Sequence, residues 1–454
     1  MTIFAFRRLT RVFAVAALLG TAACGAETAL RDVLTPSLTP HERYAKRLRD
    51  AGLDSTALGR EWMTAAERAV SQPVAVALPF RETGYLSPTE APAVGYRFFL
   101  RRGQKLDIRL EAADTAGAKL FVDLYHDPAD SANPLDHVES ADLDEPVIEY
   151  EARRDGDYLL RLQPELLRGG RYTLTLRSGA SLAFPVSGRD SRAAKSFFGA
   201  ERDGGLRDHH GIDIFAPRGT PVLAASEGVV RNVGTTSRGG KVVWVFDVKR
   251  SQSIYYAHLD SQMARPGALV RIGDTLGLVG NTGNARSTPP HLHFGIYRRG
   301  EGPVDPFPFV HQMNVAPARV VADLSELGEW VRTSAPLVSL RSAPLDGAPL
   351  VARLPRYTVV RIEGASGSWY RARLPDGATG WLAARFAERA RRPLRTERLT
   401  AEVTVREGPG SSARPMEQVG RGTGVPVLGR FAEYLYVQTP DGRTGWVAAA
   451  EGAR

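Results

Sequence analysis

The sequence predicts a mostly β, multidomain protein. After residue 73, most of the chain consists of short runs of alternating apolar and polar residues, separated by turn residues, which is typical of half-buried strands. Its 454 residues are too many for one ordinary core, so we expect about three or four domains. A hydrophobic content of 43% with 24% charged residues is normal for globular protein and argues against wholesale disorder.

The charge is basic and unevenly distributed. The chain has 59 Lys and Arg against 50 Asp and Glu, a formal net charge of +9. Residues 74–180 hold 13 basic and 18 acidic side chains, a net of −5, whereas residues 331–454 hold 19 basic and 11 acidic ones, a net of +8. A basic C-terminal part favours an anionic partner, such as nucleic acid, a membrane surface or a cell-wall polymer. The alternative is that the charge serves solubility alone.

Residues 1–23 have the composition of a secretory signal. Three arginines precede an apolar run, Val12 to Leu19, that is too short to span a bilayer. Cys24 is the only cysteine and stands where a signal would be cleaved. "TAAC" resembles a bacterial lipobox, which implies that Cys24 is acylated and becomes the first mature residue. The alternative is an ordinary signal with an incidental cysteine.

Either kind of signal implies an exported protein and excludes nucleic acid as a partner. Gly25 after the cysteine resembles the outer-membrane sorting rule of Gram-negative lipoproteins. If the source is Gram-negative, this resemblance implies a lipid anchor in the outer membrane, facing the periplasm.

Two segments, residues 24–73 and 74–180, follow the predicted signal. Residues 24–73 are expected to form a linker and helices, because apolar residues recur at spacings of three and four. Residues 74–180, with "GYRFFLRRGQKLDIRL" and "GRYTLTL", are expected to form a β-sandwich. They resemble the pre-peptidase modules of secreted bacterial proteases. His126 and His137 stand alone there and are expected at the surface.

In "STPPHLHFGIY", two histidines stand one residue apart. Side chains alternate along a strand, so His291 and His293 point to one face and Leu292 to the other. Pro289 and Pro290 restrict the backbone just before them. This pattern fits half of a metal site, or a strand that contains histidine by chance.

A second polar pair lies upstream in "RDHHGIDIFAPRGTPV". On an extended backbone His209, Gly211 and Asp213 share one face, and His210 points away. With an imidazole from another strand, His209 and Asp213 would make a three-ligand zinc set with a fourth position free for water, as a catalytic zinc requires. A third histidine, His258 in "SIYYAHLD", is either part of this group or a satisfied core histidine.

Together these motifs resemble the LytM/lysostaphin-type zinc metallopeptidases, which cut peptide bonds in peptidoglycan. "HHGIDIFAPRGTPV", "YYAHL" and "GNTGN…TPPHLHFGIY" occur in the order of that family, and the resemblance covers residues 184–312. It implies an antiparallel-β domain of the duplicated hybrid motif type. It also implies that His209, Asp213 and His293 bind one Zn²⁺, and that His258 and His291 are a catalytic pair that does not bind the metal.

The last part of the chain contains a duplication. "VSLRSAPLDG … DGATGWLAARF" and "VTVREGPGSS … DGRTGWVAAAE" superpose at a constant offset of 65 residues. The pattern resembles bacterial SH3-like domains, which implies two small barrels, at residues 331–388 and 396–454. Trp381 and Trp446 occupy equivalent positions and are expected to pack in the core at the end of each barrel.

These observations predict an exported, lipid-anchored zinc endopeptidase that acts on peptidoglycan stems or cross-links. Two other classes of function stay open. One is a non-enzymatic regulator that activates other wall hydrolases. The retention of all five candidate ligand and catalytic residues argues against it: His209, Asp213, His258, His291 and His293. The other is a secreted protease acting on foreign proteins or walls.

Overall fold

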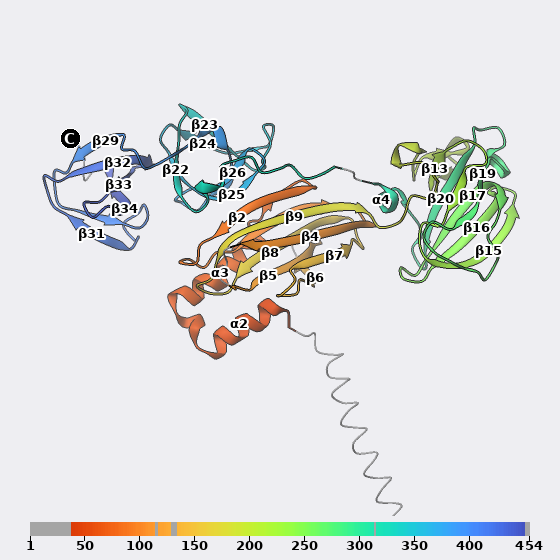
Figure 1. Cartoon of the computed structure of the whole chain (residues 1–454), viewed down its shortest axis with the longest axis horizontal. Coiled ribbons are helices and arrows are strands. Elements are labelled where there is room, and N and C mark those ends of the chain that lie inside the picture. Colours follow the sequence, from red (N-terminus) through yellow and green to blue (C-terminus); the bar gives the residue numbers. More distant parts are fainter. Residues whose placement is uncertain (1–37, 114–116, 129–133, 313–314, 450–454) are drawn as a thin grey trace, which may run out of the picture. The chain divides into compact units, whose positions relative to one another are not determined.

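The computed structural model describes residues 38–113, 117–128, 134–312 and 315–449, and they form a mostly β protein (Figure 1). This confirms the predicted fold class. The predicted signal and Cys24 lie outside the described residues. Within the described ranges, no helix is both long enough and apolar enough to cross a membrane.

The described chain begins with the expected helices, α2 (Pro40–Asp50) and α3 (Ala57–Ser71). α2 begins with a capping box, in which Thr39 and Glu42 each accept a hydrogen bond from the other's backbone N–H. This pairing satisfies donors that the first turn would otherwise leave without a partner.

The β-sandwich consists of two sheets around one core, to which Tyr96, Leu106 and Leu174 belong. The first sheet has the order β1 (Val74–Ala75), β3 (Val94–Leu100), β8 (Gly156–Pro164), β5 (Leu120–Asp127) and β6 (Asp136–Ser140). The second has the order β2 (Phe80–Leu86), β9 (Gly170–Ala180), β4 (Gln104–Ala113) and β7 (Val147–Glu151). His137 is exposed, but His126 is buried and packs edge-on against Tyr158, so the expected surface position of His126 is wrong.

The following segment forms a ten-stranded sheet (Figure 1). Its main path is β10 (Ala194–Ser196), β13 (Ile212–Phe215), β20 (His291–Arg298), β17 (Gln252–Gln262), β16 (Gly240–Asp247), β15 (Gly228–Thr236) and β18 (Leu269–Val270). β14 (Pro221–Leu223), β19 (Thr275–Val279) and β21 (Gly302–Val304) pair off this path. A short hairpin, β11 (Glu201–Arg202) and β12 (Arg207–Asp208), precedes β13, and helix α4 (Phe307–Val310) follows β21.

The duplication appears in the structure strand by strand. The first copy contains β22 (Trp330–Thr333), β23 (Leu337–Arg341), β24 (Leu350–Pro355), β25 (Val359–Ser366), β26 (Trp369–Arg373), β27 (Thr379–Ala383) and β28 (Ala387–Arg389). The second contains β29 (Arg395–Arg398), β30 (Val403–Arg406), β31 (Pro415–Val419), β32 (Gly424–Phe431), β33 (Tyr434–Gln438) and β34 (Thr444–Ala448). β25, β26 and β27 coincide with β32, β33 and β34 at the offset of 65 residues.

The first copy is joined to the β-sandwich. β25 pairs with β2, so the second sandwich sheet continues into the first repeat. Arg371 donates hydrogen bonds to Glu82 Oε1 across this junction, and both side chains are almost completely buried. Trp381 is fully buried in the sandwich core, with its ring 6.1 Å from that of Phe80. Its equivalent, Trp446, is buried against Trp330 of the first copy. Both tryptophans therefore pack as expected in a core, but each core includes residues of the preceding domain.

Candidate functional site

Asp213 and His293 face each other across two neighbouring strands. β13 and β20 run antiparallel, and their register places Asp213 directly opposite His293. Side chains alternate along a strand, so Ile212, Ile214 and Leu292 point to the other face, where they are fully buried. The alternation thus presents one carboxylate and one imidazole on the same face of the sheet.

His209 reaches this face from outside β13. The sequence predicted extended backbone from residue 209 to residue 213, but β13 begins only at Ile212. The backbone N–H of His209 instead donates to Ala200 O at 2.9 Å, and its carbonyl accepts from Gly199 N at 2.9 Å. The position of His209 therefore depends on the segment before it, which the strand pattern did not reveal.

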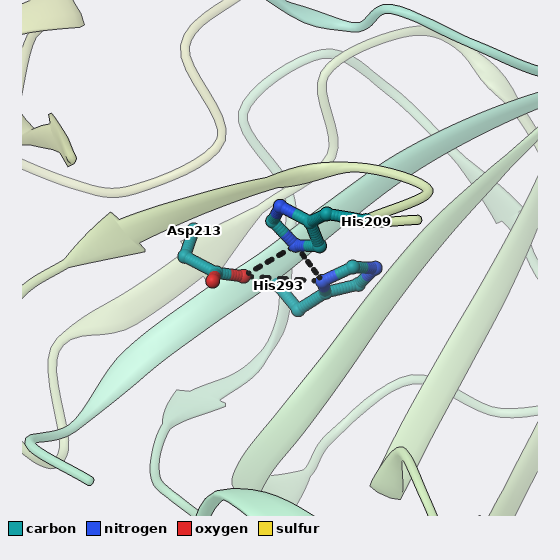
Figure 2. A group of neighbouring side chains, drawn as sticks. All are labelled: His209, Asp213 and His293. Carbon is teal, nitrogen blue, oxygen red and sulfur yellow. Dashed lines mark hydrogen bonds and ion pairs between the residues drawn. The ribbon is translucent and has the colours of Figure 1, made fainter. Parts of the chain in front are cut away.

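The three side chains point toward one another, as Figure 2 shows. His209 Nε2 lies 3.0 Å from both Asp213 Oδ1 and His293 Nδ1, and His293 Nδ1 lies 3.1 Å from Asp213 Oδ1. Tetrahedral zinc with bonds of about 2.0–2.1 Å has ligand atoms about 3.3 Å apart. Two nitrogens and one carboxylate oxygen in a triangle of this size fit a single zinc ion.

A hydrogen bond selects the free nitrogen of His209. His209 Nδ1 lies 2.9 Å from Phe197 O. Because a carbonyl oxygen only accepts, Nδ1 must carry the proton, which leaves the lone pair on Nε2 at the triangle. Metal-binding histidines are commonly oriented by a contact of this kind.

Gly211 allows the triangle to close. A Cβ at this position would lie 2.5 Å from Phe294 O and 2.8 Å from the ring of His293. Such distances are too short for any side chain, so only glycine lets the segment approach β20 this closely. The absence of a side chain at Gly211 therefore leaves the space that the ring of His293 occupies.

Asp213 is held in its charged form. Burial alone would raise the pKa of its carboxyl, but the contacts with the imidazoles of His209 and His293 outweigh burial, and the pKa lies well below its usual range. The second carboxylate oxygen, Oδ2, accepts a hydrogen bond from Arg202 Nη2 at 3.1 Å. Arg202 is not among the residues predicted from the sequence, because it comes from β11 and no periodic pattern links it to the site.

His258 and His291 lie beside the triangle. Their rings are 5.1 Å apart, and the ring of His258 is 5.8 Å from that of His293. Nδ1 of His258 donates to Thr282 O at 2.9 Å, and Nδ1 of His291 donates to Pro289 O at 2.8 Å. Whenever either ring is neutral, Nε2 is therefore its unprotonated nitrogen.

His258 has an unusual backbone. Its φ of 63° is in the left-handed region, which costs a residue other than glycine about 1–3 kcal/mol. Strand β17 changes partner here: it pairs with β20 up to Ala257 and with β19 from Leu259. Burial, then the charges of His293 and His291, lower the pKa of His258 to about 4, so its ring is neutral at neutral pH.

These residues line a groove of about 700 Å³. One wall is aromatic, with the ring of Trp244 4.4 Å from that of Tyr255 and 5.1 Å from that of Tyr297. Arg202 and Arg238 also line the groove. The five residues expected to carry the chemistry are therefore together in one concave site, while His210 is exposed and outside the triangle.

Two protein families match this chain. Residues 207–306 match Peptidase family M23, and residues 336–388 and 401–452 each match the bacterial SH3 domain family. The chain thus contains an M23 peptidase domain, of the LytM type, followed by two bacterial SH3 domains. All five candidate residues lie within the M23 match.

The chain is also similar to named endopeptidases. An L-Ala–D-Glu endopeptidase of Bacillus subtilis is 36% identical over 28% of this chain and 42% of its own length. The peptidoglycan DD-endopeptidase ShyC of Vibrio cholerae is 36% identical over 26% of this chain and 28% of its own length. The chain therefore spans less than half the length of these relatives. The solved catalytic domain of lysostaphin from Staphylococcus simulans is 29% identical over 26% of this chain and 94% of that domain, with a TM-score of 0.24.

Proposed function

We propose that this chain is a zinc-dependent endopeptidase that cleaves peptide bonds in the stems or cross-links of peptidoglycan. The observation that carries the proposal is the triangle of His209 Nε2, Asp213 Oδ1 and His293 Nδ1, with two further imidazoles beside it. The similarity to an L-Ala–D-Glu endopeptidase and to a peptidoglycan DD-endopeptidase supports this substrate class.

In this proposal His209, Asp213 and His293 hold the zinc, and His258 and His291 act on the substrate. Zinc bound there would polarise the scissile carbonyl and make a water molecule acidic near neutral pH. In the neutral rings of His258 and His291, Nε2 is the nitrogen without a proton, because Nδ1 donates to a backbone carbonyl. One ring can accept a proton at Nε2, and the other, once protonated, can donate from Nε2 to the oxygen or nitrogen that becomes negative. The two roles are assigned to the pair as a whole.

The direct test is digestion of purified sacculi by the full chain, with products identified by mass spectrometry. We expect new peptide ends that disappear when the metal is chelated and return when zinc is added. Absence of products with a zinc-loaded chain would favour the non-enzymatic regulator. Faster cleavage of a soluble protein than of sacculi would favour the secreted protease.

We further propose that Cys24 is diacylated in the mature, exported chain and anchors it to a membrane. The support is the unique cysteine at the end of a signal-like segment. Mass spectrometry of the mature N-terminal peptide should show the acyl groups, and Cys24→Ser should release the protein into the soluble fraction. An unmodified Cys24 on a soluble mature protein would overturn this proposal.

The SH3 domains are proposed to bind anionic wall material and so to raise the local substrate concentration. Arg353, Arg398 and Arg421 are exposed and form no ion pair with any residue that the structure describes. Replacing all three with alanine should weaken sacculus binding, most clearly at low salt, without slowing cleavage of a small soluble peptide. Unchanged sacculus affinity would count against wall targeting by these domains.

A further inference from the structure

Backbone hydrogen bonds hold the turn between β15 and β16 against the side of the groove that contains His258. The carbonyl of Gly239 accepts a hydrogen bond from the backbone N–H of His258 at 2.8 Å, and the carbonyl of Arg238 accepts one from Asn284 N at 3.0 Å. A Cβ on Gly283 would lie 2.3 Å from Arg238 O, so the neighbouring loop approaches as closely as glycine permits. The backbone of Arg238 is therefore fixed relative to His258.

The side chain of Arg238 is free. It is exposed, lines the groove, and forms no hydrogen bond or ion pair with any described residue. Arg202, by contrast, is already bound to Asp213. Burial raises the pKa of the Tyr255 phenol and the charge of Arg238 opposes that rise, which places the guanidinium within electrostatic reach of the aromatic wall.

The groove contains few acidic side chains that could form an ion pair with Arg238. Its acidic lining residues are Asp208 and Asp213, and Asp213 is already engaged by His209, His293 and Arg202. A free guanidinium on a fixed backbone matches the geometry of a carboxylate, which it can bind through two parallel hydrogen bonds.

We propose that Arg238 is a specificity residue that binds a free carboxylate of the substrate, close to the scissile bond on the side of His258. This inference rests on the proposed function and narrows its substrate class to peptides that carry an unamidated carboxylate at that place. The carboxylate belongs either to an acidic side chain or to the C-terminus of the stem peptide, since both present the same chemistry to the guanidinium.

The test compares kcat/KM of the zinc-loaded full chain on three synthetic stem peptides: one unamidated, one with its side-chain carboxylate amidated and one with its C-terminus amidated. We expect one of the two amidations to reduce kcat/KM about tenfold to hundredfold, the scale of a lost charge-assisted hydrogen bond, and thereby to identify the carboxylate. Arg238→Ala should reduce kcat/KM on the unamidated peptide to the same extent and have no further effect on that amidated peptide. Arg238→Lys should recover part of the loss.

Arg231→Ala is the matched control. Arg231 lies on the same hairpin and is exposed, but its guanidinium packs over the ring of Phe246 and does not line the groove. It should behave as the parent chain on all three peptides. Equal losses on unamidated and amidated peptides for Arg238→Ala, or no loss at all, would overturn the proposal.

Peptide affinity separates this inference from the proposed function. Calorimetry on zinc-loaded chains that carry His258→Ala, with and without Arg238→Ala, measures Kd for the same three peptides, because cleavage should there be about 10²-fold slower or more. If the parent chain cleaves none of them, the proposed function fails, but Arg238→Ala must still weaken binding of the unamidated peptide alone. If the parent chain cleaves them while Arg238→Ala has unchanged Kd and kcat/KM, only the role of Arg238 fails.

Discussion

Arg202 and Asp213 form an ion pair that uses one oxygen of the Asp213 carboxylate and leaves the other to the two histidines. Oδ2 accepts a hydrogen bond from Arg202 Nη2 at 3.1 Å, while Oδ1 belongs to the triangle with His209 and His293. Arg202 also donates to Ser196 Oγ. This arrangement fixes the rotation of the carboxylate and directs Oδ1 at the proposed metal position.

We expect Arg202→Ala to weaken zinc binding about tenfold to hundredfold, the usual effect of losing a partner that orients a ligand. Competition with a chelator of known affinity measures the change. Arg192→Ala is the control, because Arg192 is exposed and pairs with Asp190 away from the triangle. Zinc affinity equal to that of the parent chain would show that the ion pair does not position Asp213.

The proposed division between ligands and catalytic histidines predicts two different phenotypes. His293→Ala should lose zinc and activity together, because it removes one of three donor atoms. His258→Ala should keep zinc but lose activity by about 10²-fold or more, the scale of a missing proton carrier or oxyanion donor. Metal analysis of the purified chains, beside peptide cleavage, measures both effects.

His291→Ala is the sharper comparison, because His291 lies two residues from His293 on β20. It should retain zinc. A His291→Ala chain without zinc beside a His293→Ala chain that retains it would show that the two assignments are reversed.

Periodicity predicted the parts of the site that lie on regular strands. The pair His291/His293 follows the two-residue repeat of β20, and the structure brings His293 and Asp213 of β13 onto one face. The residues alone left His258 as either a site residue or a core histidine, and the family resemblance implied its catalytic role. Its orientation depends on a left-handed backbone that no alternation encodes.

The remaining contacts depend on segments that meet only in the folded chain. Arg202 reaches Asp213 from a separate hairpin, and Glu82 meets Arg371 from 289 residues away in the sequence. Neither contact has a local pattern. The duplication can be predicted from the sequence because it repeats whole strands. The burial of Trp381 against Phe80 of the sandwich cannot be predicted in this way.

A substitution at Gly211 tests whether the metal site requires the close approach of this segment to β20. Gly211→Ala should reduce zinc content and activity together, because the new Cβ would overlap Phe294 O and the ring of His293. Gly234→Ala is the matched control, since a Cβ there meets only the side chain of Asn232, at 3.7 Å or more. Parent-like zinc content in Gly211→Ala would show that β13 and β20 can separate without loss of the site.

The last prediction concerns the junction between the β-sandwich and the first SH3 domain. Burial alone would lower the pKa of Arg371, but the charge of Glu82 outweighs burial and raises it. Tyr96 and Tyr172 also donate hydrogen bonds to Glu82 Oε1. Arg371→Ala leaves this carboxylate buried without its cation and should lower the free energy of unfolding by about 3–5 kcal/mol.

Urea unfolding of the full chain measures this loss, with Arg398→Ala, an exposed arginine without an ion pair among the described residues, as the control. Replacing both partners, Arg371→Met with Glu82→Leu, should restore much of the stability, because no buried charge is then left alone.

Deleting the chain from Val331 onward would also leave Glu82 without Arg371. A loss of sacculus binding after that truncation could then come from unfolding of the β-sandwich as well as from the loss of the SH3 domains. Arg371→Ala with parent-like stability would show that the two domains are held together by the strand pairing of β2 and β25 and by Trp381, without a contribution from the ion pair.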